Sequence, residues 1–140
     1  MPMTKSQLKI TLAQLNPIVG DIDGNAQKAR LARAHAAQDM ADLLVLSELF
    51  IAGYPPEDLV LKPAFQASCR AAIEELARET ADGGPAMLIG TPWVDDGKLY
   101  NACALLDEDA SRRCGSKRTC RITAYSTKNA CSRGDPRPAR

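Results

Sequence analysis

The sequence predicts an α/β sandwich in which strands and helices follow one another in the order β-α-β-α-β-β. Three observations support this prediction. Short apolar runs typical of strands occur at residues 8–15, 43–46 and 86–90. Between them, apolar residues recur at helical spacing over residues 26–40 and 65–76. A turn signal then follows the third run and predicts a closing hairpin.

The first strand and helix are separated by a loop rich in glycine. The apolar run that starts at Leu8 ends at Asn16-Pro17, because the residue before a proline avoids the helical region. The loop covers residues 20–24, and Asn25 is a suitable N-cap for the helix. The residues predicted to form its buried stripe are Ala26, Ala29, Ala32, Ala36 and Met40.

The second strand, residues 43–46, is continuously apolar, which is typical of a strand covered on both faces. After it, residues 53–56 read Gly-Tyr-Pro-Pro and predict a rigid turn. Glu57 and Asp58 then place negative charge where the dipole of a short helix would favour it.

The second helix begins at Pro63 and ends before the Asp-Gly-Gly-Pro of residues 82–85. We expect Glu74 and Arg78 to form an ion pair one turn apart on its exposed side. The third strand follows, and residues 95–98 predict a hairpin turn to a fourth strand that ends at Leu106. The predicted buried stripe of the helix is Phe65, Cys69, Ala72, Ile73 and Leu76.

Charge divides the chain into two parts. Residues 1–108 carry nine Lys or Arg and fifteen Asp or Glu, whereas residues 109–140 carry nine and two. The second part has Ile122 as its one large aliphatic residue and Tyr125 as its one aromatic residue. We therefore predict a folded domain over 1–108 and a basic, disordered tail over 109–140, because the tail cannot bury enough surface to offset its chain entropy.

Most common catalytic and binding motifs are absent from the sequence. It holds neither glycine-rich phosphate-binding pattern, and the single histidine, His35, is expected to be exposed. The cysteine spacing does not fit a zinc site, so no metal is expected. Cys69 and Cys103 are interpreted as small core residues. No apolar run is long enough to cross a bilayer, and no secretory signal is recognised.

Glu48 and Tyr54 are the candidate functional residues. Glu48 follows a strand predicted to be buried, at the sheet edge where α/β proteins bind ligands, and partial desolvation there would suit a general base. The alternative is a solvated acid in a loop, and position alone favours it. Tyr54 either packs the turn against the core or lines a pocket near Glu48.

Three stretches of the sequence resemble one family. They are LKITLAQLNPIVGDIDGN (residues 8–25), ADLLVLSELFIAGYPPEDLVL (41–61) and GTPWVDDGKLYNACALL (90–106). Together they resemble the amino-terminal, nitrilase-type glutaminase (carbon-nitrogen hydrolase) domain of bacterial glutamine-dependent NAD synthetase. The resemblance implies a partial nitrilase-like α-β-β-α sandwich.

The resemblance also implies a function. The family's glutaminase domain releases ammonia from glutamine with a Glu-Lys-Cys set, and a separate domain uses ATP and Mg²⁺ to amidate nicotinic acid adenine dinucleotide to NAD. Glu48 matches the general base, and Tyr54 matches a tyrosine of the glutamine pocket. The family is cytoplasmic and homo-oligomeric. We expect this chain to be inactive alone and to bind no cofactor itself, since the nucleophilic cysteine segment and the synthetase domain are missing.

The resemblance stops where the charge changes. The family continues with a lysine and then Leu-Pro-Asn-Tyr-Gly-Val-Phe-Asp-Glu-Lys-Arg. Back-translation of residues 109–140, read one base earlier, permits this segment, and Lys117 falls where the family lysine belongs. We therefore predict a shift of reading frame near residues 107–109.

Two other functions remain open. One is a different amidase of the nitrilase superfamily, against which the string Gly-Tyr-Pro-Pro-Glu-Asp-Leu argues. The other, which is less favoured, is a non-catalytic domain whose basic tail binds nucleic acid or another acidic partner through its cations.

Overall fold

The computed structural model describes residues 7–107 and 121–125 of the chain. Their elements confirm the predicted order β-α-β-α-β-β and the short helix expected at Glu57, which is a 3₁₀ helix. They add a second 3₁₀ helix and a fifth strand. The elements are β1 (Ile10–Leu12), α1 (Ile22–Gln38), β2 (Leu43–Val45), η1 (Glu57–Leu61), α2 (Pro63–Glu79), η2 (Thr80–Asp82), β3 (Ala86–Asp95), β4 (Lys98–Leu106) and β5 (Arg121–Tyr125).

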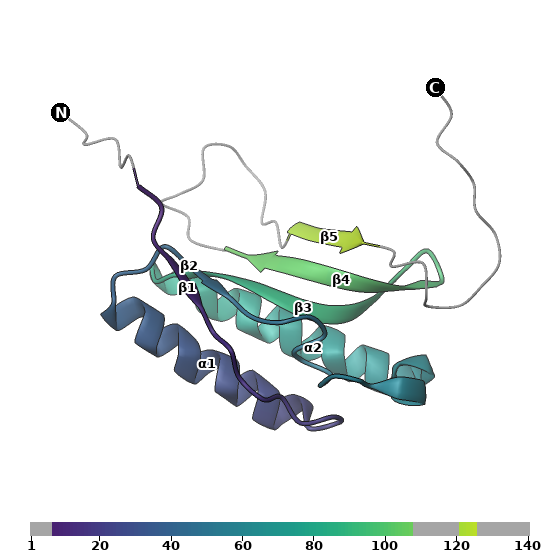
Figure 1. The fold of residues 1–140 in the computed structure, drawn as a ribbon. Helices are drawn as coiled ribbons and strands as arrows, with labels where there is room; N and C mark the ends of the chain where they lie inside the picture. Colours follow the sequence, from purple (N-terminus) through teal and green to yellow (C-terminus); the bar gives the residue numbers. More distant parts are fainter. Residues whose placement is uncertain (1–6, 108–120, 126–140) are drawn as a thin grey trace.

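The five strands form one sheet in the order β1-β2-β3-β4-β5. The first three strands are parallel, and β4 and β5 each run antiparallel to the strand before them. Both helices lie on the same face of this sheet (Figure 1). The described residues therefore supply a sheet with one helical layer, which is half of an α-β-β-α sandwich.

The tail prediction for residues 109–140 falls mostly outside the described residues. Within that segment the structure describes β5, which pairs with β4 and for which the sequence analysis predicted no element. The hairpin between β3 and β4 was predicted correctly, with Asp95 opposite Lys98. Asp96 and Gly97 at its turn both have positive φ, which this type of turn requires.

The core lies between the sheet and the two helices. Leu44, Met87 and Leu106 are cross-strand neighbours on the helical face, and each is at most 1% exposed. The apolar stripe of α2 is confirmed, since Cys69, Ile73 and Leu76 are fully buried beside them, and small alanines let α1 pack nearby. The buried alanines of α1 are Ala26, Ala29 and Ala36, whereas Met40 lies beyond the helix and is exposed.

The other face of the sheet carries apolar side chains that the described residues do not cover. Ile10 is 47% and Leu12 71% exposed, and the remaining residues are half-buried. The prediction that the second strand is covered on both faces is therefore wrong for this part of the chain. We call this surface the open face; its apolar residues are Ile10, Leu12, Leu43, Val45, Leu88 and Leu105.

The start of α1 differs from the prediction. Asp21, not Asn25, is the N-cap, and its carboxylate accepts a hydrogen bond from the Gly24 amide at 3.0 Å. Asn25 is instead fully buried. Its side-chain amide donates to the carbonyls of Ile18 and Ile51, and its oxygen accepts from the Ile18 amide. Asn25 thus joins the loop before α1 to the loop after β2.

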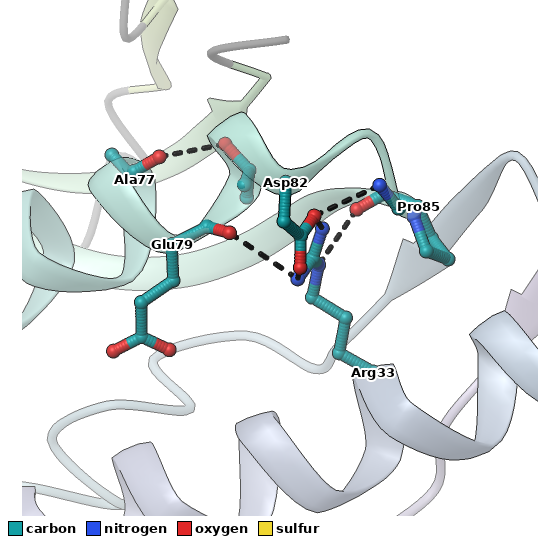
Figure 2. Close-up of polar contacts among 7 residues, drawn as sticks. Arg33, Ala77, Glu79, Asp82 and Pro85 are labelled. Carbon is teal, nitrogen blue, oxygen red and sulfur yellow. Dashed lines mark hydrogen bonds and ion pairs between the residues drawn. The ribbon is translucent and has the colours of Figure 1, made fainter.

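Ion pairs connect the two helices and the turn that follows α2. The Arg33 guanidinium binds both oxygens of Asp82, at 2.6 and 2.9 Å, and also donates to the Pro85 carbonyl (Figure 2). These contacts fix where α1 lies against the chain entering β3. On α2 itself, Glu74 pairs with Arg70 at 3.0 Å, so the predicted pairing with Arg78 is wrong.

His35 is exposed on α1, as predicted. Among the helices of the described residues, none combines the length and apolar character that a membrane span needs.

Candidate functional site

Glu48 lies in the loop that leaves β2 and crosses over β3. The Leu46 amide donates to the Leu88 carbonyl at 2.9 Å, so the chain stays paired with β3 for one residue beyond β2. The Ile51 amide then donates to the Gly90 carbonyl at 3.2 Å. Between these two bonds the chain arches over β3, and Glu48 is in the middle of the arch.

Gly90 allows this close crossing. A Cβ atom at Gly90 would lie 2.3 Å from the Leu49 nitrogen, 2.6 Å from the Ser47 oxygen and 2.8 Å from the Glu48 carbonyl carbon. All three neighbours are backbone atoms, so no side chain could turn aside to make room. Leu49 has a φ of +48°, an uncommon value for a residue with a side chain. The arch is therefore a constrained segment supported by a glycine.

A side chain from β4 contacts the carboxylate. The side-chain amide Nδ2 of Asn101 donates a hydrogen bond to Oε1 of Glu48 at 2.5 Å. The register of β3 and β4 places Asn101 opposite Pro92 and Cys103 opposite Gly90. Side chains of residues 101 and 103 therefore lie on the same face of the sheet as the arch, which is the open face.

These residues surround a hollow of about 270 Å³. Glu48 itself is exposed, as in the alternative of a solvated acid in a loop, and the partial desolvation expected of a general base is not found within the described residues. The physical reason is that the hollow lies on the open face, where nothing in this part of the chain covers it. The lining residues are Leu46, Ser47, Glu48, Gly90, Asn101, Ala102 and Cys103.

The thiol in the hollow is not an activated nucleophile. Cys103 is half-buried rather than part of the core, which corrects the prediction, and burial raises its pKa. Cys69 is a core residue, as predicted, and burial raises its pKa to about 12. Since the thiolate is the reactive form, both cysteines are held in their unreactive state at neutral pH.

Tyr54 does not join Glu48 in the hollow. It is 61% exposed and is not among the residues that line the cavity. It follows Gly53, whose φ of +80° and close approach to the Val19 backbone leave no room for a Cβ. Lys117, the third residue that the resemblance suggested, lies outside the described residues.

Two residues of the site, Asn101 and Gly90, were not predicted from the sequence. A polar residue inside the apolar run of β4 was an available signal for Asn101, and a glycine in the strand predicted over residues 86–90 was one for Gly90. Among the described residues, no group of three His, Cys, Asp or Glu side chains is placed to hold a metal ion.

Comparison with known proteins gives a consistent result. The family model described as carbon-nitrogen hydrolase matches residues 9–130. Glutamine-dependent NAD(+) synthetase of Rhodobacter capsulatus is 47% identical over 102 residues, and that of Thermotoga maritima is 43% identical over 103 residues. Each match covers 73% of this chain and 18% of the relative, so the chain spans about a fifth of their length.

Solved structures agree with this comparison. Glutamine-dependent NAD+ synthetase from Acinetobacter baumannii superimposes with a TM-score of 0.65 and 34% identity, over 71% of this chain and 19% of that one. An amidase from Nesterenkonia sp. superimposes with a TM-score of 0.62 and 25% identity, over 71% of this chain and 38% of that one.

Proposed function

Because the chain belongs to the carbon-nitrogen hydrolase family, we propose that it is the front part of a glutaminase that hydrolyses glutamine and supplies ammonia for NAD synthesis. The 47% identity to a glutamine-dependent NAD(+) synthetase is the observation that carries this proposal. It is supported by the position of Glu48, on an arch at the carboxyl end of a parallel strand, where α/β proteins bind ligands.

In this proposal Glu48 is the general base. Its carboxylate accepts the proton of an incoming thiol, and the thiolate attacks the carboxamide carbon of glutamine. Glu48 returns that proton to the amide nitrogen, which leaves as ammonia, and water then hydrolyses the thioester and releases glutamate from the enzyme. The thiol is proposed to lie outside these 140 residues, since none of the five cysteines of the sequence is followed by Glu-Asp, as the family nucleophile is. The chain alone is therefore inactive.

Tyr54 is proposed to reach the glutamine once the open face is covered. It lies six residues after Glu48, in a loop held by the hydrogen bond from Asn25 to the Ile51 carbonyl. ATP and Mg²⁺ belong to the synthetase part of the family proteins, which lies outside the matched region. Assembly into a homo-oligomer and a cytoplasmic location complete the proposal.

The change of reading frame near residues 107–109 is part of the proposal. Sequencing of the gene from codon 105 onward tests it: the frame one base earlier should encode Leu-Pro-Asn-Tyr-Gly-Val-Phe-Asp-Glu-Lys-Arg after codon 117. If close homologous genes encode residues 112–140 in the same phase as this chain, the frame hypothesis is wrong.

The function itself is tested by rejoining the two frames and expressing the gene. The rejoined protein should release ammonia from glutamine, and Glu48→Gln should lower the rate at least about 100-fold, as expected for loss of a general base. Glu57→Gln, which changes an exposed acid of η1, is the matched control and should leave the rate unchanged. Retention of activity in Glu48→Gln would exclude Glu48 as the base.

A second candidate is an amidase that acts on other amides. The superposition with the Nesterenkonia amidase favours it. A panel of amides separates the two candidates, because a glutaminase should prefer glutamine over simple aliphatic amides. Faster hydrolysis of a simple amide would favour the second candidate.

A further inference from the structure

The contact between Asn101 and Glu48 joins two parts of the chain that are 53 residues apart. We propose that Asn101 is a positioning residue, which holds Oε1 of Glu48 so that Oε2 is the oxygen that takes the proton. This inference rests on the proposed role of Glu48 as a base. It adds a residue that acts through Glu48 without itself contacting the reacting atoms.

The backbone around Asn101 is suited to this task. Asn101 lies within β4 and is paired with Pro92 of β3 on one side and with Tyr125 of β5 on the other. A residue on a strand with neighbours on both sides is held more rigidly than a loop residue. The side chain is half-buried, so its amide has few alternative orientations. The more mobile partner, the exposed carboxylate, is thus held by the more rigid one.

The chemistry of an amide also fits. A carboxylate that acts as a base has to be oriented without being neutralised. The side-chain amide of Asn101 donates hydrogen bonds but carries no charge and does not titrate. A lysine or arginine in its place would stabilise the ionised carboxylate by a full charge and weaken it as a base. Within the described residues, Oε1 is the Glu48 oxygen that receives a hydrogen bond, which leaves Oε2 available.

A second support acts on the backbone of Glu48. The arch is fixed to β3 by the bonds of Leu46 and Ile51, and it lies directly over Gly90. These contacts set the height of Glu48 above the sheet, but they leave its side-chain torsions free. The bond from Asn101 restrains those torsions. Asn101 and Gly90 therefore perform separate functions: Gly90 sets the height of the arch, and Asn101 restrains the side chain that the arch carries.

Nuclear magnetic resonance of the full 140-residue chain tests the proposal. One side-chain amide proton of Asn101 should resonate downfield of those of Asn16, an exposed asparagine that serves as the internal reference. In Glu48→Ala this proton should move to the Asn16 position while the backbone resonances of β4 stay in place. A merely structural asparagine would not respond to loss of the carboxylate in this way.

Chemical labelling provides the second readout. Asn101→Leu keeps the size of the side chain but removes the donor, so a water-soluble carbodiimide with an added amine should label Glu48 severalfold faster than in the unaltered chain. Labelling of the exposed Glu57 should not change. If the leucine variant lacks the thermal transition of the parent chain, Asn101→Ala is used in its place. Asn16→Leu is the control substitution.

The proposal is overturned if the Asn101 amide does not differ from that of Asn16, or if Glu48 is labelled at the same rate without Asn101. Neither readout needs turnover. Loss of the contact would therefore refute the positioning role and leave the glutaminase proposal to its own assay. Conversely, if the rejoined protein releases no ammonia, the glutaminase proposal fails, but the contact between Asn101 and Glu48 can still be measured in the 140-residue chain.

Discussion

Replacement of Gly90 by alanine should destabilise the chain through a single backbone clash. The added Cβ would lie 2.3 Å from the Leu49 nitrogen and 2.6 Å from the Ser47 oxygen, where ordinary contacts are at least 3.4 Å. The arch has to lift by about 1 Å to relieve both contacts, and the bond from the Ile51 amide to the Gly90 carbonyl, already 3.2 Å long, would break. Overpacking costs about 1–3 kcal/mol and a lost hydrogen bond about 1 kcal/mol.

We therefore expect Gly90→Ala to lower the free energy of unfolding by about 3 kcal/mol, which corresponds to roughly 10–15 °C in Tm for a domain of this size. Thermal and urea denaturation followed by circular dichroism measure this change. Gly97→Ala is the matched control: nothing lies within 4 Å of its added Cβ, and its φ of +72° alone costs about 1 kcal/mol. If the two variants melt within a degree of each other, the close crossing over Gly90 is not as described.

Two further predictions concern titratable groups. The Arg33 guanidinium lowers the pKa of Asp82 to about 2 from its ordinary 3.8, so the stability from this pair is complete above pH 4 and is lost as the pH falls toward 2. Because the Asp82 side chain is 58% exposed, solvent screening limits the loss to about 1 kcal/mol or less, and Asp82→Asn should remove it in acid titrations while Asp95→Asn does not. The pKa of about 12 for Cys69 predicts that iodoacetamide at pH 8 labels it slowly in the folded chain and rapidly in urea, as measured by mass spectrometry of its peptide. Equal labelling rates in both states would show that Cys69 is not buried.

The periodic parts of the fold could be predicted from the sequence. The stripe from Phe65 to Leu76 identified the buried side of α2, because one face of a long helix must pack against the sheet. The start of α1 could not be predicted in the same way. Asp21 and Asn25 are both good caps, and Gly24 between them reads as a loop residue. The choice depended on tertiary contacts, since Asn25 is used to join two loops.

In the candidate site, too, the features that depend on local sequence could be predicted, and those that depend on tertiary contacts could not. Glu48 could be located because its position depends only on the strand before it. Its contact with Asn101 could not, because that contact depends on the register of β4, on the hairpin at Asp96 and on the arch over Gly90 together. The exposure of Glu48 agrees with the solvated acid that its position alone favoured. The desolvation expected of a general base was not found, since a continuous apolar run such as residues 43–46 does not reveal whether the segment that covers it belongs to the same chain.

The open face connects the stability of this chain with its proposed chemistry. Leu12 and Ile10 are exposed on it, and the hollow with Glu48 opens on the same side of the sheet. Any segment that packs on this face buries the apolar side chains and, in the same step, removes water from the carboxylate proposed as base. Covering the face therefore stabilises the fold and prepares the site together. It follows that a rejoined protein should gain both ammonia release and a higher Tm. If only one of these two properties increases, covering the open face is not what prepares the site.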